Sequence, residues 1–154
     1  MKTIFATIGA MLLVSNAFAD ERRVIIDLRS DDTNRIEARL IGDIKDMRAH
    51  YAAQGHDFKV VVVISGRAYK FFVEDLDASP YKDEGGLSEI NAGLTPLMRE
   101  LVSDYKVDFQ MCTVGMETLG IKKETLYPYV NAVTSQPILL IDHQNDGYAY
   151  LPIT

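Results

Sequence analysis

The sequence predicts an α/β domain in which strands and helices alternate along the chain. Two runs of apolar, mostly β-branched residues, 24–28 and 58–64, predict buried strands. Between them, apolar residues recur at steps of three and four from Asn34 to Gln54, a spacing typical of a helix. The second run is apolar almost throughout, so we expect both of its faces to be buried, as in a parallel sheet covered by helices.

The rest of the chain continues this alternation. Thr95 and Pro96 predict the start of a helix, because threonine caps helix N-termini and proline suits the first helical turn. The whole pattern is typical of a doubly wound α/β domain with right-handed crossovers. Further strands are expected at 107–111, 130–133 and 147–151, helices at 67–74, 95–105, 113–119, 123–126 and 136–145, and an exposed loop at 77–86.

The first nineteen residues predict a secretory signal peptide. Lys2 is followed by an apolar run over residues 3–14, and Ala17-Phe18-Ala19 is a small-x-small cleavage motif. The apolar run is shorter than the roughly 20 residues that cross a bilayer. We therefore expect cleavage before Asp20, a single domain at 20–154, and a periplasmic or secreted protein without membrane attachment after cleavage.

Composition and charge narrow the classes of partner. The mature chain would have 154 − 19 = 135 residues, enough to bury on the order of 68% of the unfolded surface in one core. Without Lys2 the chain has 15 basic and 22 acidic residues, a formal charge of −7. No basic run is interleaved with aromatic residues, so neither nucleic acid nor an anionic membrane is an expected partner.

Cys112 is the only cysteine of the chain. Small exported proteins usually contain even numbers of cysteines joined in disulfides. A single thiol excludes both an internal disulfide and a CxxC oxidoreductase. Three roles remain for Cys112: a structural core residue, an intermolecular bridge, or a reactive group.

The predicted position of Cys112 favours reactivity. It follows the strand at 107–111 and precedes the helix at 113–119, and ligands of open α/β sheets bind beyond the carboxyl ends of strands. A helix N-terminus stabilises a thiolate by roughly 0.3 to 2 kcal/mol, which at the upper end lowers a thiol pKa from about 8.5 to about 7. The alternative is a small buried apolar residue. An unpaired thiol is an oxidation hazard outside the cytoplasm, which tips the balance towards a functional role.

Residues at the predicted strand ends are candidates for substrate binding. Their loops are expected to face Cys112 across the carboxyl edge of the sheet. Arg67 could hold an anionic donor or a persulfide, and the alternative is a solvated arginine. The candidates are Ser30, Asp31, Ser65, Gly66, Arg67 and Thr113.

No metal or cofactor is predicted. His50, His56 and His143 lack metal-ligand spacing with one another or with Cys112. The sequence contains no P-loop, no GxGxxG motif and no Ser-His-Asp arrangement, so hydrolase, nucleotidase and dehydrogenase functions have no support.

The C-terminal part of the sequence resembles the DsrE/DsrF-like family of sulfur-handling proteins, particularly its exported members. The resemblance begins with LTPLMRELVSDYKVDFQMC, a helix and a strand that end at Cys112. It continues through METLGIKKETLYPYVNAV to the tail HQNDGYAYLPI and covers roughly the last 60 residues. The cysteine, the following Gly-Ile, the L-x-P-x-V motif and the terminal GYAYLP together make the signal specific.

This resemblance implies a three-layer α/β/α domain with a five-stranded, mostly parallel sheet, assembled into homo-oligomers such as trimers or hexamers. In sulfur-relay members the cysteine corresponding to Cys112 receives sulfur as a persulfide and passes it to a partner protein. One thiol is sufficient for this chemistry, because the thiolate attacks a sulfane sulfur and the persulfide is then attacked by an acceptor thiolate.

These observations leave three hypotheses. The first is an exported sulfur carrier or sulfurtransferase-like protein that forms a persulfide on Cys112 and exchanges sulfur with a donor or acceptor protein. The second is a non-catalytic oligomeric module with an inert, buried cysteine. The third is a small-ligand-binding module that uses the same edge of the sheet without covalent chemistry.

Overall fold

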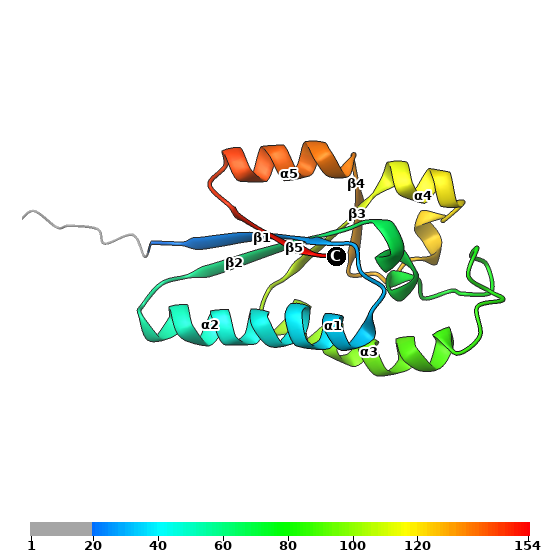
Figure 1. Cartoon of the computed structure of the whole chain (residues 1–154), viewed down its shortest axis with the longest axis horizontal. Coiled ribbons are helices and arrows are strands. Elements are labelled where there is room, and N and C mark those ends of the chain that lie inside the picture. Colours follow the sequence, from blue (N-terminus) through cyan, green and yellow to red (C-terminus); the bar gives the residue numbers. More distant parts are fainter. Residues whose placement is uncertain (1–19) are drawn as a thin grey trace, which may run out of the picture.

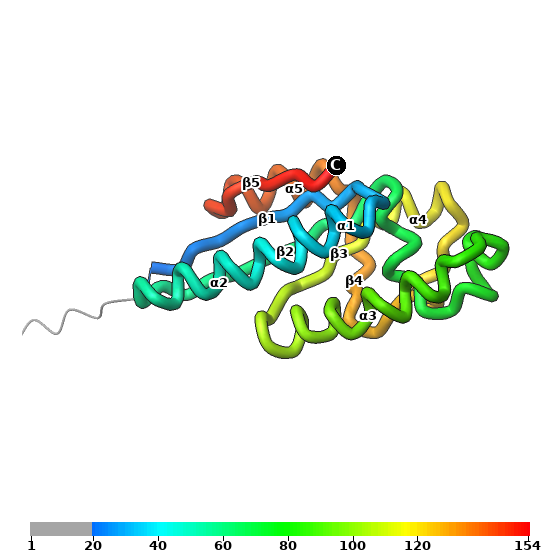
Figure 2. The backbone as a smooth tube through the Cα atoms, turned by 60° about the horizontal axis from the view of Figure 1, so that its bottom comes forward, coloured from blue at the N-terminus to red at the C-terminus, as the bar shows by residue number. Residues whose placement is uncertain are grey.

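A five-stranded sheet forms the centre of the computed structural model, which describes residues 20–154 (Figure 1). The strand order is β4-β3-β2-β1-β5, and all four pairings between these strands are parallel. Figure 2 shows β5 and β4 at opposite edges of the sheet. The signal peptide predicted at 1–19 lies outside the described residues and stays a prediction. The strands are β1 (Arg22–Leu28), β2 (Phe58–Ile64), β3 (Asp108–Cys112), β4 (Val130–Val133) and β5 (Ala149–Ile153).

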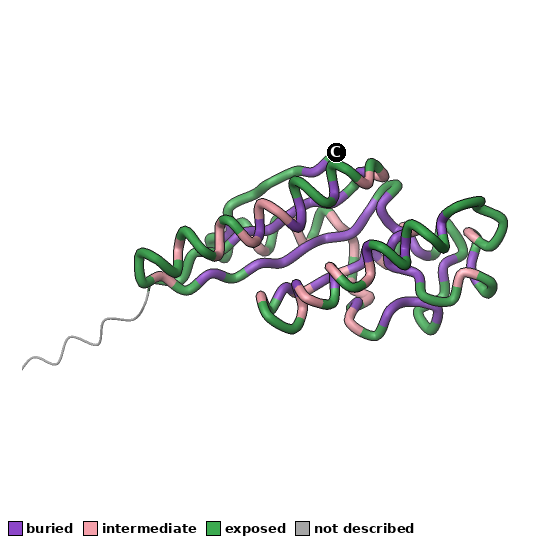
Figure 3. Tube along the Cα trace, turned by 90° about the horizontal axis from the view of Figure 1, so that it is seen from below, coloured by how far each residue is buried: buried purple, intermediate pink, exposed green. Residues whose placement is uncertain are grey.

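One face of the sheet is covered by the longest helices. A continuous helical segment consists of α1 (Thr33–Arg35), a π-helical stretch η1 (Ile36–Gly42) and α2 (Asp43–Ala53), and α3 (Leu87–Ser103) lies beside it. Alternate residues of β1 and β2 join the apolar side chains of these helices in the main core. In Figure 3 the buried stretches run through the interior, and exposed residues lie mostly on helices and loops.

The opposite face is covered more thinly, by α5 (Gln136–Asn145) and α4 (Thr113–Leu119) (Figure 1). Its core is a small cluster of Ile25, Val61, Val63 and Tyr148, against which two half-buried leucines of α5 pack. No residue of α5 is fully buried. These layers confirm the predicted three-layer α/β/α fold with a parallel sheet. No helix within residues 20–154 is both long and apolar enough to cross a membrane.

The start of α3 differs from the prediction. Thr95 and Pro96 do not begin this helix, which starts eight residues earlier, after Gly86 in the left-handed conformation (φ 79°). Pro96 lies inside the helix on its exposed side, where the carbonyl group that loses its hydrogen bond faces towards solvent. Burial of apolar residues on the other side, Leu94 and Met98 among them, outweighs the cost of the proline.

The last strand also differs from the prediction, because it spans Ala149–Ile153 and not 147–151. Gly147 has a positive φ of 85° and belongs to the turn that ends α5. Ile153 is the buried residue of β5, and its carbonyl oxygen accepts hydrogen bonds from the backbone N–H groups of Arg29 and Ser30. Pro152 is tolerated because β5 pairs only with β1 and forms an edge of the sheet.

Candidate functional site around Cys112

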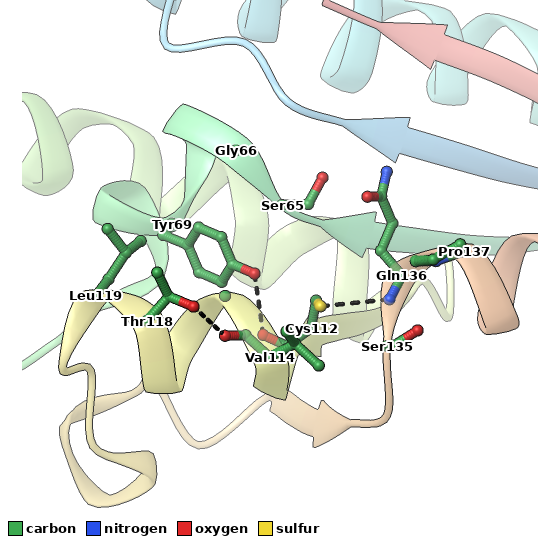
Figure 4. A pocket seen from close by; sticks show the side chains of 11 residues that line it. Ser65, Gly66, Tyr69, Cys112, Val114, Thr118, Leu119, Ser135, Gln136 and Pro137 are labelled. Atoms are coloured by element: carbon green, nitrogen blue, oxygen red, sulfur yellow. Dashed lines mark hydrogen bonds between the residues drawn. The ribbon is translucent and has the colours of Figure 1, made fainter.

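Cys112 is the last residue of β3 and the residue that caps the start of α4. Only 6% of its surface is exposed, yet it lines an open cavity of about 460 Å³. The cavity lies at the carboxyl edge of the sheet, between the segments that follow β2, β3 and β4 (Figure 4). The thiol is thus largely shielded from bulk water and reachable from one side.

Backbone N–H groups converge on the sulfur. The N–H of Gln136, at the start of α5, donates to Cys112 Sγ at 3.3 Å (Figure 4). Burial by itself raises the pKa of the Cys112 thiol, but the N–H groups of Gly115, Gln136 and Val114 favour the thiolate. The net direction is a lowered pKa for this thiol. The pocket therefore favours a nucleophilic sulfur.

Tyr69 fixes the backbone beside the thiol. It comes from η2 (Gly66–Phe72), a 3₁₀ helix after β2, and its hydroxyl donates to the carbonyl oxygen of Cys112 at 2.9 Å. Burial raises the pKa of the Tyr69 hydroxyl, so it stays a proton donor at neutral pH. Its ring lies against Gly115, where a Cβ atom would be only 2.0 Å from the hydroxyl oxygen. Glycine at 115 is therefore what allows α4 and Tyr69 to approach each other.

A buried carboxyl group lies behind the wall of the cavity. Asp27, the last residue but one of β1, is 1% exposed and accepts hydrogen bonds from the Gln136 side-chain amide (2.6 Å) and the Tyr150 hydroxyl (3.1 Å). The Ser65 hydroxyl lies at 3.5 Å from the same carboxyl group. Because Gln136 also contacts the sulfur through its backbone, Asp27 ties the start of α5 to the sheet and to the thiol.

Two of the candidate binding residues lie at the cavity with Cys112. Ser65 and Gly66 follow β2 and line it directly. Gly66 has a positive φ of 60°, and a Cβ atom there would lie 3.3 Å from the carbonyl oxygen of Arg29. A glycine at this position lets the loops after β1 and β2 run close together.

The other four candidates do not line the cavity. Asp31 and Arg67 form an ion pair at 2.8 Å, and this partner lowers the pKa of the Asp31 carboxyl group. The Arg67 side chain is 73% exposed and therefore does not point its charge at the thiol. Ser30 is buried in its own loop, where its hydroxyl accepts a hydrogen bond from the backbone N–H of Asp32. Thr113 is half-buried at the first position of α4.

The site also contains residues that the sequence analysis did not single out, namely Tyr69, Gly115, Gln136 and Asp27. A signal existed for Asp27, because it is a charged residue within the apolar run 24–28 of β1. Gln136 acts on the sulfur through its backbone N–H, which leaves no signature in the residue type.

The three histidines lie apart from the thiol. His50 is hydrogen-bonded to Gln54, His143 packs on the ring of Tyr148, and His56 contacts Arg22. Within the part of the chain that the structure describes, no group of three or more His, Cys, Asp or Glu side chains is gathered for a metal ion.

Comparison with known proteins places this geometry in context. The model of the DsrE/DsrF-like family matches residues 41–153. An uncharacterized protein of Aquifex aeolicus (strain VF5) is 29% identical over 135 residues, which are 88% of this chain and 57% of that longer protein. A solved structure of a protein of unknown function from Methanobacterium thermoautotrophicum has a TM-score of 0.60 at 20% identity, over 86% of this chain and 99% of that one.

The pH dependence of alkylation tests the state of the thiol. The folded protein lowers the pKa of Cys112, so its alkylation by iodoacetamide should reach half its maximal rate at a lower pH than in the urea-unfolded chain. A thiol pKa that is lower in the folded than in the unfolded protein also raises the free energy of unfolding. This contribution is fully present above the pKa of the unfolded thiol and is lost as the pH falls through the pKa of the folded thiol. A folded midpoint at or above the unfolded one would contradict the described environment.

Substitution of Gly115 tests the contact with Tyr69. Gly115→Ala should lower the free energy of unfolding by about 1–3 kcal/mol through overpacking and raise the thiol pKa by displacing the N–H donors of α4. Gly93→Ala is the matched control, because a Cβ atom there meets nothing within 4 Å, and it should stabilise α3 by about 0.4–1 kcal/mol. Urea denaturation measures the free energy of unfolding, and the pH profile of alkylation measures the thiol pKa. If Gly115→Ala and Gly93→Ala change both quantities equally, the contact between Gly115 and Tyr69 is not important.

Proposed function

The chain belongs to the DsrE/DsrF-like family, and on this premise we propose that it is a sulfur carrier that holds sulfane sulfur as a persulfide on Cys112. The observation that carries the proposal is a single, largely buried thiol that opens into a cavity while N–H groups converge on its sulfur. Such surroundings favour the thiolate and limit access of bulk water to a persulfide.

The proposed chemistry consists of two thiol exchange steps. The Cys112 thiolate attacks a sulfane sulfur of a donor, the sulfur–sulfur bond of the donor breaks, and the donor leaves as a thiolate or as a shortened polysulfide. Cys112 then carries the persulfide until an acceptor thiolate attacks its outer sulfur and releases the Cys112 thiolate. The N–H of Gln136 is placed to stabilise this thiolate both before attack and after release.

The low exposure of the thiol favours a second candidate function. At 6% exposure, Cys112 is also compatible with a non-catalytic module whose cysteine is inert and whose cavity holds a small ligand without covalent chemistry. The two functions differ in whether the folded protein accepts sulfur.

Intact mass spectrometry after exposure to polysulfide distinguishes them. The folded protein should gain whole sulfur atoms, in steps of about 32 Da, that a reductant removes. Cys112→Ser keeps the size of the side chain, removes the nucleophile and should gain none. Absence of any gain, under conditions that modify a small free thiol, would favour the inert module.

We also propose that the chain assembles with further copies of itself through α5. Ile138 and Ile141 are 49% and 58% exposed on this helix, which has no fully buried residue. Burying such side chains against another copy would remove apolar surface from water at about 25 cal/mol per Å².

Light scattering coupled to size-exclusion chromatography tests this assembly. The protein should elute with the mass of a trimer or hexamer, and Ile141→Glu should shift it towards the monomer. Ile90→Glu is the control, since Ile90 is 40% exposed on α3, on the other side of the sheet. A monomeric wild-type protein would exclude the assembly.

A further inference from the structure

The side chains of the Cys112 cavity supply no positive charge for an anion. Among the described residues that line the cavity, none has a charged side chain. Its lining combines small polar residues such as Ser65 with apolar side chains at the mouth, where Val114 and Leu119 are 54% and 42% exposed. A site built for a small anion would be expected to offer arginine or lysine donors.

Two cations of the segment after β2 are engaged elsewhere. Arg67 pairs with Asp31 at 2.8 Å, and Lys70 contacts Glu84 at 2.6 Å and Asp31 at 3.8 Å. Neither cation belongs to the cavity lining. Arg29, in the loop after β1, is exposed and does not line the cavity either.

An acidic residue, Asp27, stands behind the wall of the cavity. Two lining residues, Ser65 and Gln136, contact the carboxyl group of Asp27. Among the described residues, all of its side-chain hydrogen-bond partners are uncharged donors. Ser65 and the Gln136 amide thus direct hydrogen-bond donors at Asp27 and away from an anion that enters the cavity.

We propose that the Cys112 cavity selects uncharged sulfur donors with an apolar group next to the sulfur, namely organic persulfides in their protonated form, over small inorganic anions such as thiosulfate. This inference rests on the proposed function of Cys112 as a sulfur acceptor. Val114 and Leu119 contact the apolar group of the donor. Asp27 draws the side-chain donors of Ser65 and Gln136 away from an entering anion.

The step balances with the donor alone. The Cys112 thiolate attacks the outer sulfur of R–S–SH, the sulfur–sulfur bond breaks, and R–S⁻ leaves while Cys112 becomes the protonated persulfide. No oxidant or reductant is consumed. An uncharged donor brings no second negative charge to the Cys112 thiolate, which is the electrostatic reason for the selection.

Alkylation rates measure the selection without any sulfur transfer. Iodoacetamide and iodoacetate differ mainly in charge, so the ratio of their rate constants on Cys112 is compared with the same ratio on 2-mercaptoethanol in 0.15 M salt, which screens surface charges. The protein should favour iodoacetamide by at least tenfold more than the small thiol does. Equal ratios, or no alkylation of the folded protein by either reagent, would overturn the proposal.

Two variants locate the origin of the selection. Asp27→Asn keeps the shape of the side chain and should reduce the preference for iodoacetamide several-fold. Its control is Asp57→Asn, the same substitution at an exposed residue just before β2, at the end of the sheet opposite the cavity. Leu119→Lys adds a cation at the mouth and should also reduce the preference, with Ile90→Lys on α3 as its control. If the control variants change the ratio of the iodoacetamide and iodoacetate rate constants as much as the site variants do, the selection does not originate from Asp27 and the cavity mouth.

Sulfur donors complete the test. Mass spectrometry should show faster persulfide formation on Cys112 from benzyl persulfide than from thiosulfate. Persulfide formation without selection by charge would reject this inference and leave the proposed function standing. Charge-selective alkylation without any persulfide would reject the proposed function, and with it the assignment of donors.

Discussion

Parallel pairing of the strands is the constraint on which the site depends. Ile64 at the end of β2 pairs with Met111, so Cys112 lies level with Ser65 on one side and pairs with Val133 of β4 on the other. The segments that follow β2, β3 and β4 therefore leave the sheet at nearly the same level, to within one or two residues. The thiol, the hydroxyl of Ser65 and the start of α5 meet there because the backbone hydrogen bonds of the sheet set the register.

Hydrogen bonds between these loops then give the cavity its chemistry. Tyr69 holds the carbonyl group of Cys112, and Gln136 donates its backbone N–H to the sulfur and its side-chain amide to Asp27. Each contact joins segments that are far apart in the sequence, and each links the thiol to a different part of the sheet. The sulfur is thereby held in one orientation, which is the condition for a nucleophile to act at low exposure.

The features that could be predicted from the sequence are those that depend on periodicity and on strand ends. Apolar runs located β2 and β3, and the position of Cys112 at the end of β3 followed from them. Contacts such as that of Asp31 with Arg67, or of Gln136 with the sulfur, depend on which loops meet in space. The start of α3 was missed because a strong local capping pattern at Thr95 was overruled by burial along the whole helix.

The proline of the last strand has a consequence for the outer edge of the sheet. Backbone groups of successive residues point to opposite sides of a strand, and Ile153 directs its carbonyl group to the β1 side. Pro152 therefore faces outward, where its ring removes a backbone donor from the open edge of β5. A foreign strand cannot complete a ladder along this edge, so the exposed Tyr150 and Leu151 beside it are protected from edge-to-edge aggregation.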